Sequence, residues 1–238
     1  MRLFVLCFGI LLGLAQAAAA ADFSHWAVLI VAGDDHAHSG AHSMVFDNAR
    51  RDLAKAFAGI GFNPANMVQF SVDQPDAQHS NPSAIADALW DLTNRAPAGC
   101  LIYFTSHGSP DGIVVDDTQI SPPKMAAIIG NACGSKPSVI VMSACFSGIF
   151  VPALAAPNRL VFSAARPDRT SFGCGESDHY TFFDTCFLQS LPGSSDFPDL
   201  AHTVQACVAQ REKEERVDYP SEPQLFVGPE VAASLRWR

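Results

Sequence analysis

The chain alternates short, continuous apolar runs with segments in which apolar residues recur at helical spacing. Residues 26–32 (WAVLIVA) form such a run before Gly33, a pattern typical of a strand buried on both faces of a parallel sheet. In residues 44–57, apolar side chains recur every three or four positions, which indicates a crossover helix. The same alternation predicts strands at 26–32, 67–72, 100–106, 138–144, 160–164 and 224–227, and helices at 44–57, 82–95, 122–132, 179–191 and 199–215.

This alternation of strand and helix predicts an α/β fold with a mostly parallel sheet and right-handed crossovers. Ligands of such sheets bind beyond the carboxyl ends of the strands. The polar connectors 73–82 and 192–198 are too short to separate domains. Of the 238 residues, 48% are hydrophobic, enough for one substantial core. We therefore expect a single domain over residues 22–238.

Residues 1–21 have the composition of a secretory signal peptide. Arg2 supplies a positive charge, residues 3–14 are almost wholly apolar, and residues 16–21 end in small side chains suited to cleavage. The apolar stretch is short for a membrane span, which needs about 18 or more residues, and an uncleaved anchor is the alternative. We expect an exported protein with no membrane span after cleavage. The bacterial character of the signal favours a periplasmic or secreted location.

The formal net charge of −9 at pH 7 bears on possible partners. No stripe of Lys and Arg recurs along the chain, and a phosphate backbone would repel this excess of carboxylates. Nucleic acid is therefore not an expected partner.

Two predicted strands end in chemically reactive residues. His107 and Gly108 follow the third strand in YFTSHGS, and Cys145 follows the fourth in VMSACFSG. Adjacent parallel strands lie about 4.8 Å apart, so an imidazole and a thiol at their carboxyl ends can share one crevice. This pair suits nucleophilic acyl transfer, with Cys145 as nucleophile and His107 as base and acid. The backbone N–H groups of Gly108 and Cys145 would form the oxyanion hole.

Two other enzyme classes do not fit these motifs. A cysteine phosphatase needs an arginine six residues after its cysteine to hold phosphate. In this chain that position, 151, is Val151. A serine hydrolase would need a Gly-x-Ser-x-Gly motif after a strand, and the residues around Cys145 do not form this motif.

The sequence resembles the legumain-type cysteine peptidases, relatives of the caspases and of the GPI transamidase catalytic subunit. The resemblance rests on AVLIVAG (27–33), FTSHG (104–108), SACFSG (143–148), RTSFGCG (169–175) and SEPQLFVG (221–228). It implies a caspase-like three-layer α/β/α sandwich with a mostly parallel six-stranded sheet. It also implies that His107 and Cys145 are the catalytic dyad.

The same resemblance implies a substrate pocket at the strand ends. Ala41 replaces an arginine of animal and plant legumains, and Phe146 replaces an acidic residue usual after the nucleophile, so cleavage strictly after asparagine is not implied. The pocket is expected to include His42, Phe146, Ser163, Thr170, Ser171 and Asp178.

These observations predict a cysteine endopeptidase that acts on peptides or proteins through a thioester and needs no cofactor. Attack on the same thioester by an amine would make the protein a transpeptidase or ligase. An inactive peptide-binding domain of the same fold is the alternative from another class. The run DDHAHSGAH (34–42) has the composition of a metal site, but we interpret it as a solvated, substrate-facing loop without metal.

Six cysteines remain once Cys7 is removed with the signal. An oxidising compartment permits disulfides among them. Cys100 and Cys133 lie at the amino edges of neighbouring strands, and Cys186 and Cys207 lie on successive helices. We hypothesise the pairs Cys100–Cys133 and Cys186–Cys207, which leaves Cys174 free beside the pocket.

Overall fold

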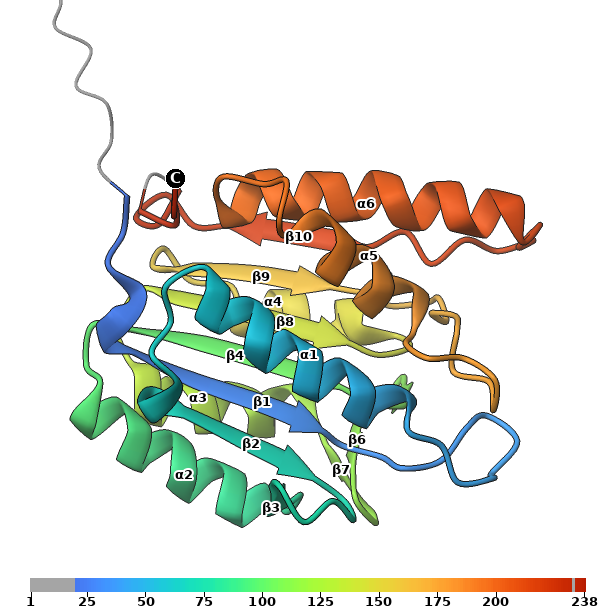
Figure 1. Ribbon diagram of the computed structural model, residues 1–238, viewed down its shortest axis with the longest axis horizontal. Coiled ribbons are helices and arrows are strands. Elements are labelled where there is room, and N and C mark those ends of the chain that lie inside the picture. The colour runs from blue at the N-terminus through green and yellow to red at the C-terminus, as the bar shows by residue number, and fades with distance from the viewer. Residues whose placement is uncertain (1–19, 233) are drawn as a thin grey trace, which may run out of the picture.

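A seven-stranded sheet lies between two layers of helices in the computed structural model, which describes residues 20–232 and 234–238 (Figure 1). Only β10 runs antiparallel to its neighbour, and the other adjacent strands are parallel. From one edge to the other, the strands are β10 (Gln224–Val227), β9 (Arg159–Ser163), β8 (Ser138–Ser143), β4 (Gly99–Thr105), β1 (Trp26–Ala32), β2 (Met67–Ser71) and β3 (Gln78–His79).

The helices cover both faces of this sheet, and each face has its own apolar core. On β1, Val28 and Ile30 belong to one core while Leu29 and Val31 belong to the other, as strand geometry requires. The helices on the first face are α1 (Val45–Gly59), α5 (Phe182–Ser190) and α6 (Phe197–Glu214); those on the second are α2 (Pro82–Arg95), α3 (Pro122–Cys133) and α4 (Phe150–Leu154).

The predicted fold class is confirmed, and the strands and helices expected from the sequence all occur within a few residues of their expected bounds. The expected number of strands is wrong. The sheet has seven strands instead of six, because the polar connector after β2 bends back and pairs as β3, with Phe70 opposite Gln78 and Ser71 opposite His79. Two exposed polar residues have no apolar pattern that would reveal this strand.

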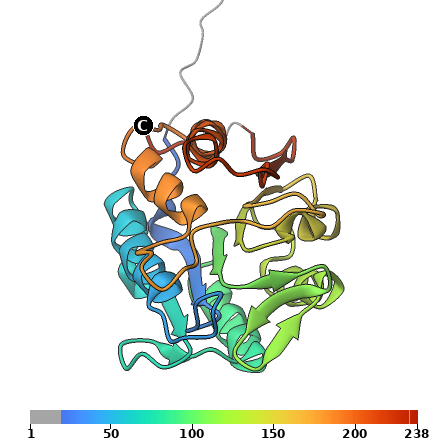
Figure 2. The same cartoon turned by 90° about the vertical axis from the view of Figure 1, so that its right-hand side faces the viewer.

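A small antiparallel sheet follows β4, in a stretch to which the sequence analysis assigned no strand or helix. It consists of β5 (Gly108–Ser109), β6 (Gly112–Val115) and β7 (Thr118–Ile120), and it lies at the edge of the molecule that faces the viewer in Figure 2. Ile113 of this sheet is buried in the second apolar core. The described residues also contain three 3₁₀ turns, namely η1 (Phe23–His25), η2 (Pro64–Asn66) and η3 (Ser147–Ile149).

Side-chain caps decide where two of the later helices begin. α5 begins at Phe182 instead of the expected 179, because the Thr181 hydroxyl accepts the N–H of Asp184. α6 begins at Phe197, because Asp196 accepts the N–H of Asp199.

Two disulfides brace the helical layers. Cys100–Cys133 joins the start of β4 to the end of α3, and Cys186–Cys207 joins α5 to α6. These are the pairs hypothesised from the sequence. Cys145 and Cys174 are free in the part of the chain that the structure describes.

The expected signal peptide lies almost wholly outside the described residues. Within the described residues, no helix combines the length and the apolar character that crossing a membrane requires.

Candidate active site

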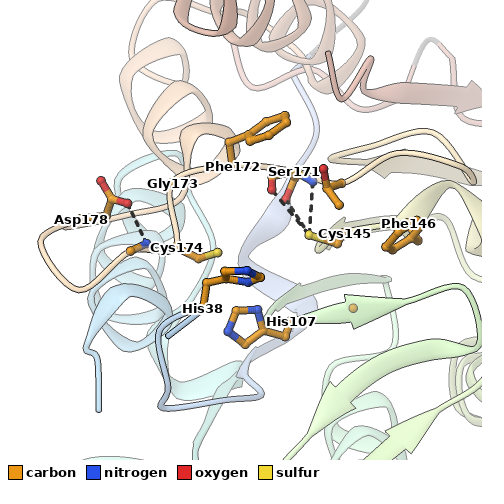
Figure 3. A pocket seen from close by; sticks show the side chains of 12 residues that line it. His38, His107, Cys145, Phe146, Ser171, Phe172, Gly173, Cys174 and Asp178 are labelled. Carbon is orange, nitrogen blue, oxygen red and sulfur yellow. Dashed lines mark hydrogen bonds between the residues drawn. The ribbon is translucent and has the colours of Figure 1, made fainter. Parts of the chain in front are cut away.

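The carboxyl ends of β4 and β8 bring His107 and Cys145 to one cavity. The two strands are parallel, and Thr105 lies opposite Ser143. His107 therefore follows Thr105 by two residues, and Cys145 follows Ser143 by two residues. The N–H of Ser106 extends the pairing by donating to the Ser143 carbonyl oxygen at 3.1 Å. Both side chains line a cavity of about 480 Å³ (Figure 3).

The His107 ring is held from two sides. The buried ring of Phe46 meets it edge to face, with ring centroids 5.1 Å apart. Nε2 of His107 lies 3.0 Å from the carbonyl oxygen of His36. A carbonyl oxygen only accepts, so Nε2 carries the hydrogen and donates it. Nδ1 is therefore the nitrogen left to take a proton within the site.

Cys145 lies in a tight turn directly after β8. Phe146 has a φ of 56°, a left-handed conformation that costs a residue with a side chain about 1–2 kcal/mol. The Phe146 N–H donates to the carbonyl oxygen of Arg169 at 2.8 Å, which helps to hold this turn. The N–H of Ser171 donates to the Cys145 sulfur at 3.3 Å, and such a donor stabilises negative charge on sulfur.

Gly108 lies against the backbone of the cysteine turn. A Cβ on Gly108 would lie 2.3 Å from the carbonyl oxygen of Cys145 and 3.1 Å from the Cβ of Ala144. Only glycine fits here without displacing this backbone, so the backbones of the two motifs approach closely.

The small sheet after β4 supports this arrangement. Val114 donates its N–H to the carbonyl oxygen of His107 at 2.9 Å, and its own carbonyl accepts the Ser106 hydroxyl at 2.8 Å. These two hydrogen bonds hold the Ser106 side chain and the His107 carbonyl group against the backbone of Val114.

The walls of the cavity come mainly from one segment after β9. Of the expected pocket residues, Phe146, Thr170, Ser171 and Asp178 line the cavity. The Asp178 carboxylate accepts the N–H of Gly175 at 2.8 Å, which closes the loop between them. The complete lining is His38, His107, Gly108, Cys145, Phe146, Thr170, Ser171, Phe172, Gly173, Cys174, Gly175 and Asp178.

Two of the expected pocket residues do not line this cavity. Nε2 of His42 lies 3.2 Å from the Asp73 carboxylate, because the loop after β1 directs this exposed side chain toward β2. Ser163 is fully buried at the end of β9, and its hydroxyl donates to the carbonyl oxygen of Ala165 at 3.1 Å. Neither residue lines the cavity that His107 and Cys145 share.

His38 and Cys174 line the cavity, although the sequence analysis did not assign them to the pocket wall. The N–H of His38 donates to the Cys174 carbonyl oxygen at 3.0 Å, so the loop after β1 and the segment after β9 close the cavity together. Burial, with smaller contributions from the charges of Cys145 and Asp178, raises the pKa of Cys174 to about 11. The RTSFGCG segment could have predicted most of this wall, since residues 170–175 all line it.

The DDHAHSGAH loop gathers acidic groups around two histidines. Asp34, Asp35 and His36 lie together, and Asp35, His42 and Asp73 form a second group. Nδ1 of His36 lies 2.9 Å from both Asp34 and Asp35. The hydrogen bond to Asp34, followed by the charge of Asp35, raises the pKa of His36. These ion pairs give the exposed loop internal contacts of its own.

The overall structure is similar to the crystal structure of caspase-1 from Spodoptera frugiperda. The TM-score is 0.64 with 15% sequence identity, and the match covers 89% of each chain. This similarity establishes a caspase-like fold. A search of curated proteins found no match.

The sequence model of the peptidase C13 family matches residues 92–218, more than half of the chain. This range contains His107, Cys145 and the cavity wall from Thr170 to Asp178. The chain therefore belongs to the peptidase C13 family, the legumain family of cysteine peptidases.

Proposed function

We propose that this protein is an exported cysteine endopeptidase whose single domain, residues 22–238, uses Cys145 and His107 as its catalytic dyad. The observation that carries this proposal is the matched register of β4 and β8, which presents a thiol and an imidazole to one cavity. The hydrogen bond from Nε2 of His107 to the carbonyl oxygen of His36 adds to it, because that bond leaves Nδ1 for proton transfer.

In the proposed reaction, the Cys145 sulfur attacks the carbonyl carbon of a peptide bond while Nδ1 of His107 takes the thiol proton. The N–H groups of Gly108 and Cys145 stabilise the oxyanion, and the close approach of Gly108 to the Cys145 backbone supports this role. The C–N bond then breaks, and the leaving amine takes the proton from His107. Water, activated by the same imidazole, hydrolyses the thioester and releases Cys145.

Export is the second part of the proposal. Two disulfides among the described residues fit an oxidising compartment, where such bonds form and persist. The composition of residues 1–21 fits a signal peptide that directs the chain there. Mass spectrometry of the protein recovered from the periplasm or medium tests this part, and the mature protein should begin near residue 22.

The test of the dyad is mass spectrometry after treatment with peptidyl acyloxymethylketones that vary in the P1 residue. We expect a single adduct on Cys145, absent from Cys145→Ala and formed more slowly by His107→Ala. Two matched controls are Cys174→Ala, which removes the other free thiol, and His202→Ala, which removes an exposed imidazole on α6. Both controls should keep the adduct.

The same experiment separates the other candidate functions. Absence of any adduct on Cys145 across the P1 series would contradict the proposal and favour an inactive peptide-binding domain. An adduct combined with amine transfer in place of hydrolysis, measured with an added peptide amine, would identify a transpeptidase. The P1 residue that reacts fastest identifies the substrate preference of the cavity.

A further inference from the structure

A buried carboxyl group lies behind the proposed dyad and outside the cavity. Asp184, in the first turn of α5, is 0% exposed. Its two oxygens accept hydrogen bonds from the Tyr103 and Thr105 hydroxyls, each at 2.6 Å. Both donors are neutral and both lie on β4.

Burying this carboxyl group has a free-energy cost. Removal from water raises the pKa of Asp184 above its ordinary range and raises that of Tyr103 well above its own. An apolar side chain of similar volume would fill the space without burying a polar group. Packing alone therefore gives no reason for a carboxyl group here.

The carboxyl group lies where three parts of the proposed site meet. Thr105 precedes His107 by two residues at the end of β4. On β8, Ser143 lies opposite Thr105 in the sheet and precedes Cys145 by two residues.

The third part is the cavity wall. The N–H of Asp184 donates to the Thr181 hydroxyl at 3.0 Å, which fixes the start of α5. Phe182, the residue after Thr181, donates its N–H to the carbonyl oxygen of Phe172 in the cavity wall at 2.9 Å. Asp184 is thus hydrogen-bonded to the strand that carries the base and to the start of the helix that contacts the wall, and β8, which carries the nucleophile, pairs with that same strand at Thr105.

We infer that Asp184 is a positioning residue, which acts through Thr105 and the ends of β4 and β8 to hold His107 and Cys145 in the geometry of acyl transfer. The inference rests on the proposed function. A misplacement of about 1 Å in such a site lowers the rate about 10²-fold. A hydrogen-bonded anchor beneath the two strand ends therefore has a measurable effect on turnover.

The test compares Asp184→Asn, Thr105→Val and Tyr103→Phe. Thr105 and Tyr103 donate equally short bonds to the same carboxyl group, but Thr105 is nearer in sequence to His107, so Tyr103→Phe is the matched control. Asp184→Asn keeps the shape of the side chain and is preferred to Asp184→Ala, which could fail to fold.

Three quantities are measured for each variant: kcat and KM per active site titrated with an acyloxymethylketone, the rate at which iodoacetamide alkylates Cys145, and the melting temperature. We expect Asp184→Asn and Thr105→Val to lower kcat per titrated site about tenfold or more with little change in KM. Tyr103→Phe should lower the melting temperature with a much smaller effect on kcat.

A purely structural role for Asp184 would reduce the fraction of titratable sites and the melting temperature but leave kcat per site unchanged, and that result would overturn the inference. If the wild type cleaves no peptide, the proposed function fails by itself. The rates at which iodoacetamide alkylates Cys145 then still test the inference. It is supported if Asp184→Asn and Thr105→Val change this rate and Tyr103→Phe does not. It is contradicted if the rates of all three variants match that of the wild type.

Discussion

Gly108 packs so closely against Cys145 that a Cβ atom on Gly108 would lie 2.3 Å from the carbonyl oxygen of Cys145. The two motifs that carry the proposed dyad are thus in backbone contact, and the space between them admits only a hydrogen atom. This contact sets the position of the Gly108 N–H relative to the nucleophile.

Replacing Gly108 by alanine should lower kcat/KM about 10²-fold, because the added methyl group must displace the cysteine turn and its oxyanion donors. Steady-state cleavage of the best P1 substrate measures this effect. Gly130→Ala on α3 is the matched control, since a Cβ there meets nothing within 4 Å. The control should keep full activity and gain about 0.5–1 kcal/mol in the free energy of unfolding. Full activity in Gly108→Ala would contradict the proposed oxyanion hole.

The free thiol of Cys174 should react with iodoacetamide only at high pH. Only the thiolate reacts, and burial, with the charge of Cys145 second, raises the pKa of Cys174 to about 11. Cys174 should therefore be alkylated only as the pH approaches that value. Cys145→Ala removes the charge of Cys145 and so lowers the pKa of Cys174. In this variant, alkylation of Cys174 should therefore begin at lower pH. Peptide mapping after timed alkylation measures both rates, and fast labelling of Cys174 at neutral pH would show this prediction to be wrong.

The buried carboxyl of Asp184 should make stability depend on pH. Burial raises its folded pKa above the ordinary value of 3.8, so folding favours the protonated form. The contribution of this group to stability is complete below that ordinary value and is lost as the pH rises through the folded pKa. The free energy of unfolding of the wild type, measured in urea, should therefore fall relative to that of Asp184→Asn as the pH increases from about 4 to about 8. A difference that stays constant, or that changes in the opposite direction, would refute this account.

Each disulfide should stabilise the protein by about 3–4 kcal/mol, because it restricts the unfolded chain. The bonds close sequence separations of 33 and 21 residues, so the loss from Cys100→Ala/Cys133→Ala should slightly exceed the loss from Cys186→Ala/Cys207→Ala. Denaturant unfolding with and without a reductant measures both. Cys100 is the second residue of β4, at the end of the strand away from His107, so kcat per titrated site should not change in the first double variant. Equal stability with and without reductant would rule out a stabilising role for either bond.

Much of the fold follows from local patterns in the sequence. The runs at β1, β4 and β8 are apolar at nearly every position, and strands of that kind are stable only when both faces are covered. The crossover helices α1 and α2 show apolar side chains at helical spacing, and Asn81 with Pro82 sets the start of α2. Once the strand order is parallel, His107 and Cys145 must share an edge, because each directly follows a central strand.

Residues whose roles depend on the path of a loop could not be assigned in this way. His38 and His42 lie in the same loop and have the same chemistry, yet only His38 lines the cavity, because its N–H binds the segment after β9. His36 acts through a carbonyl oxygen, which every residue possesses, so no side-chain pattern can reveal it.

The sequence by itself determined the alternation of strands and helices and the two motifs that bear the thiol and the imidazole, because both are encoded in residues adjacent along the chain. Only the tertiary structure decided that Ser163 is buried away from the cavity, that β3 joins the sheet, and that Asp184 lies beneath the ends of β4 and β8. The physical reason is that these three features depend on contacts between segments far apart in the sequence, whose geometry local hydrophobic periodicity does not specify.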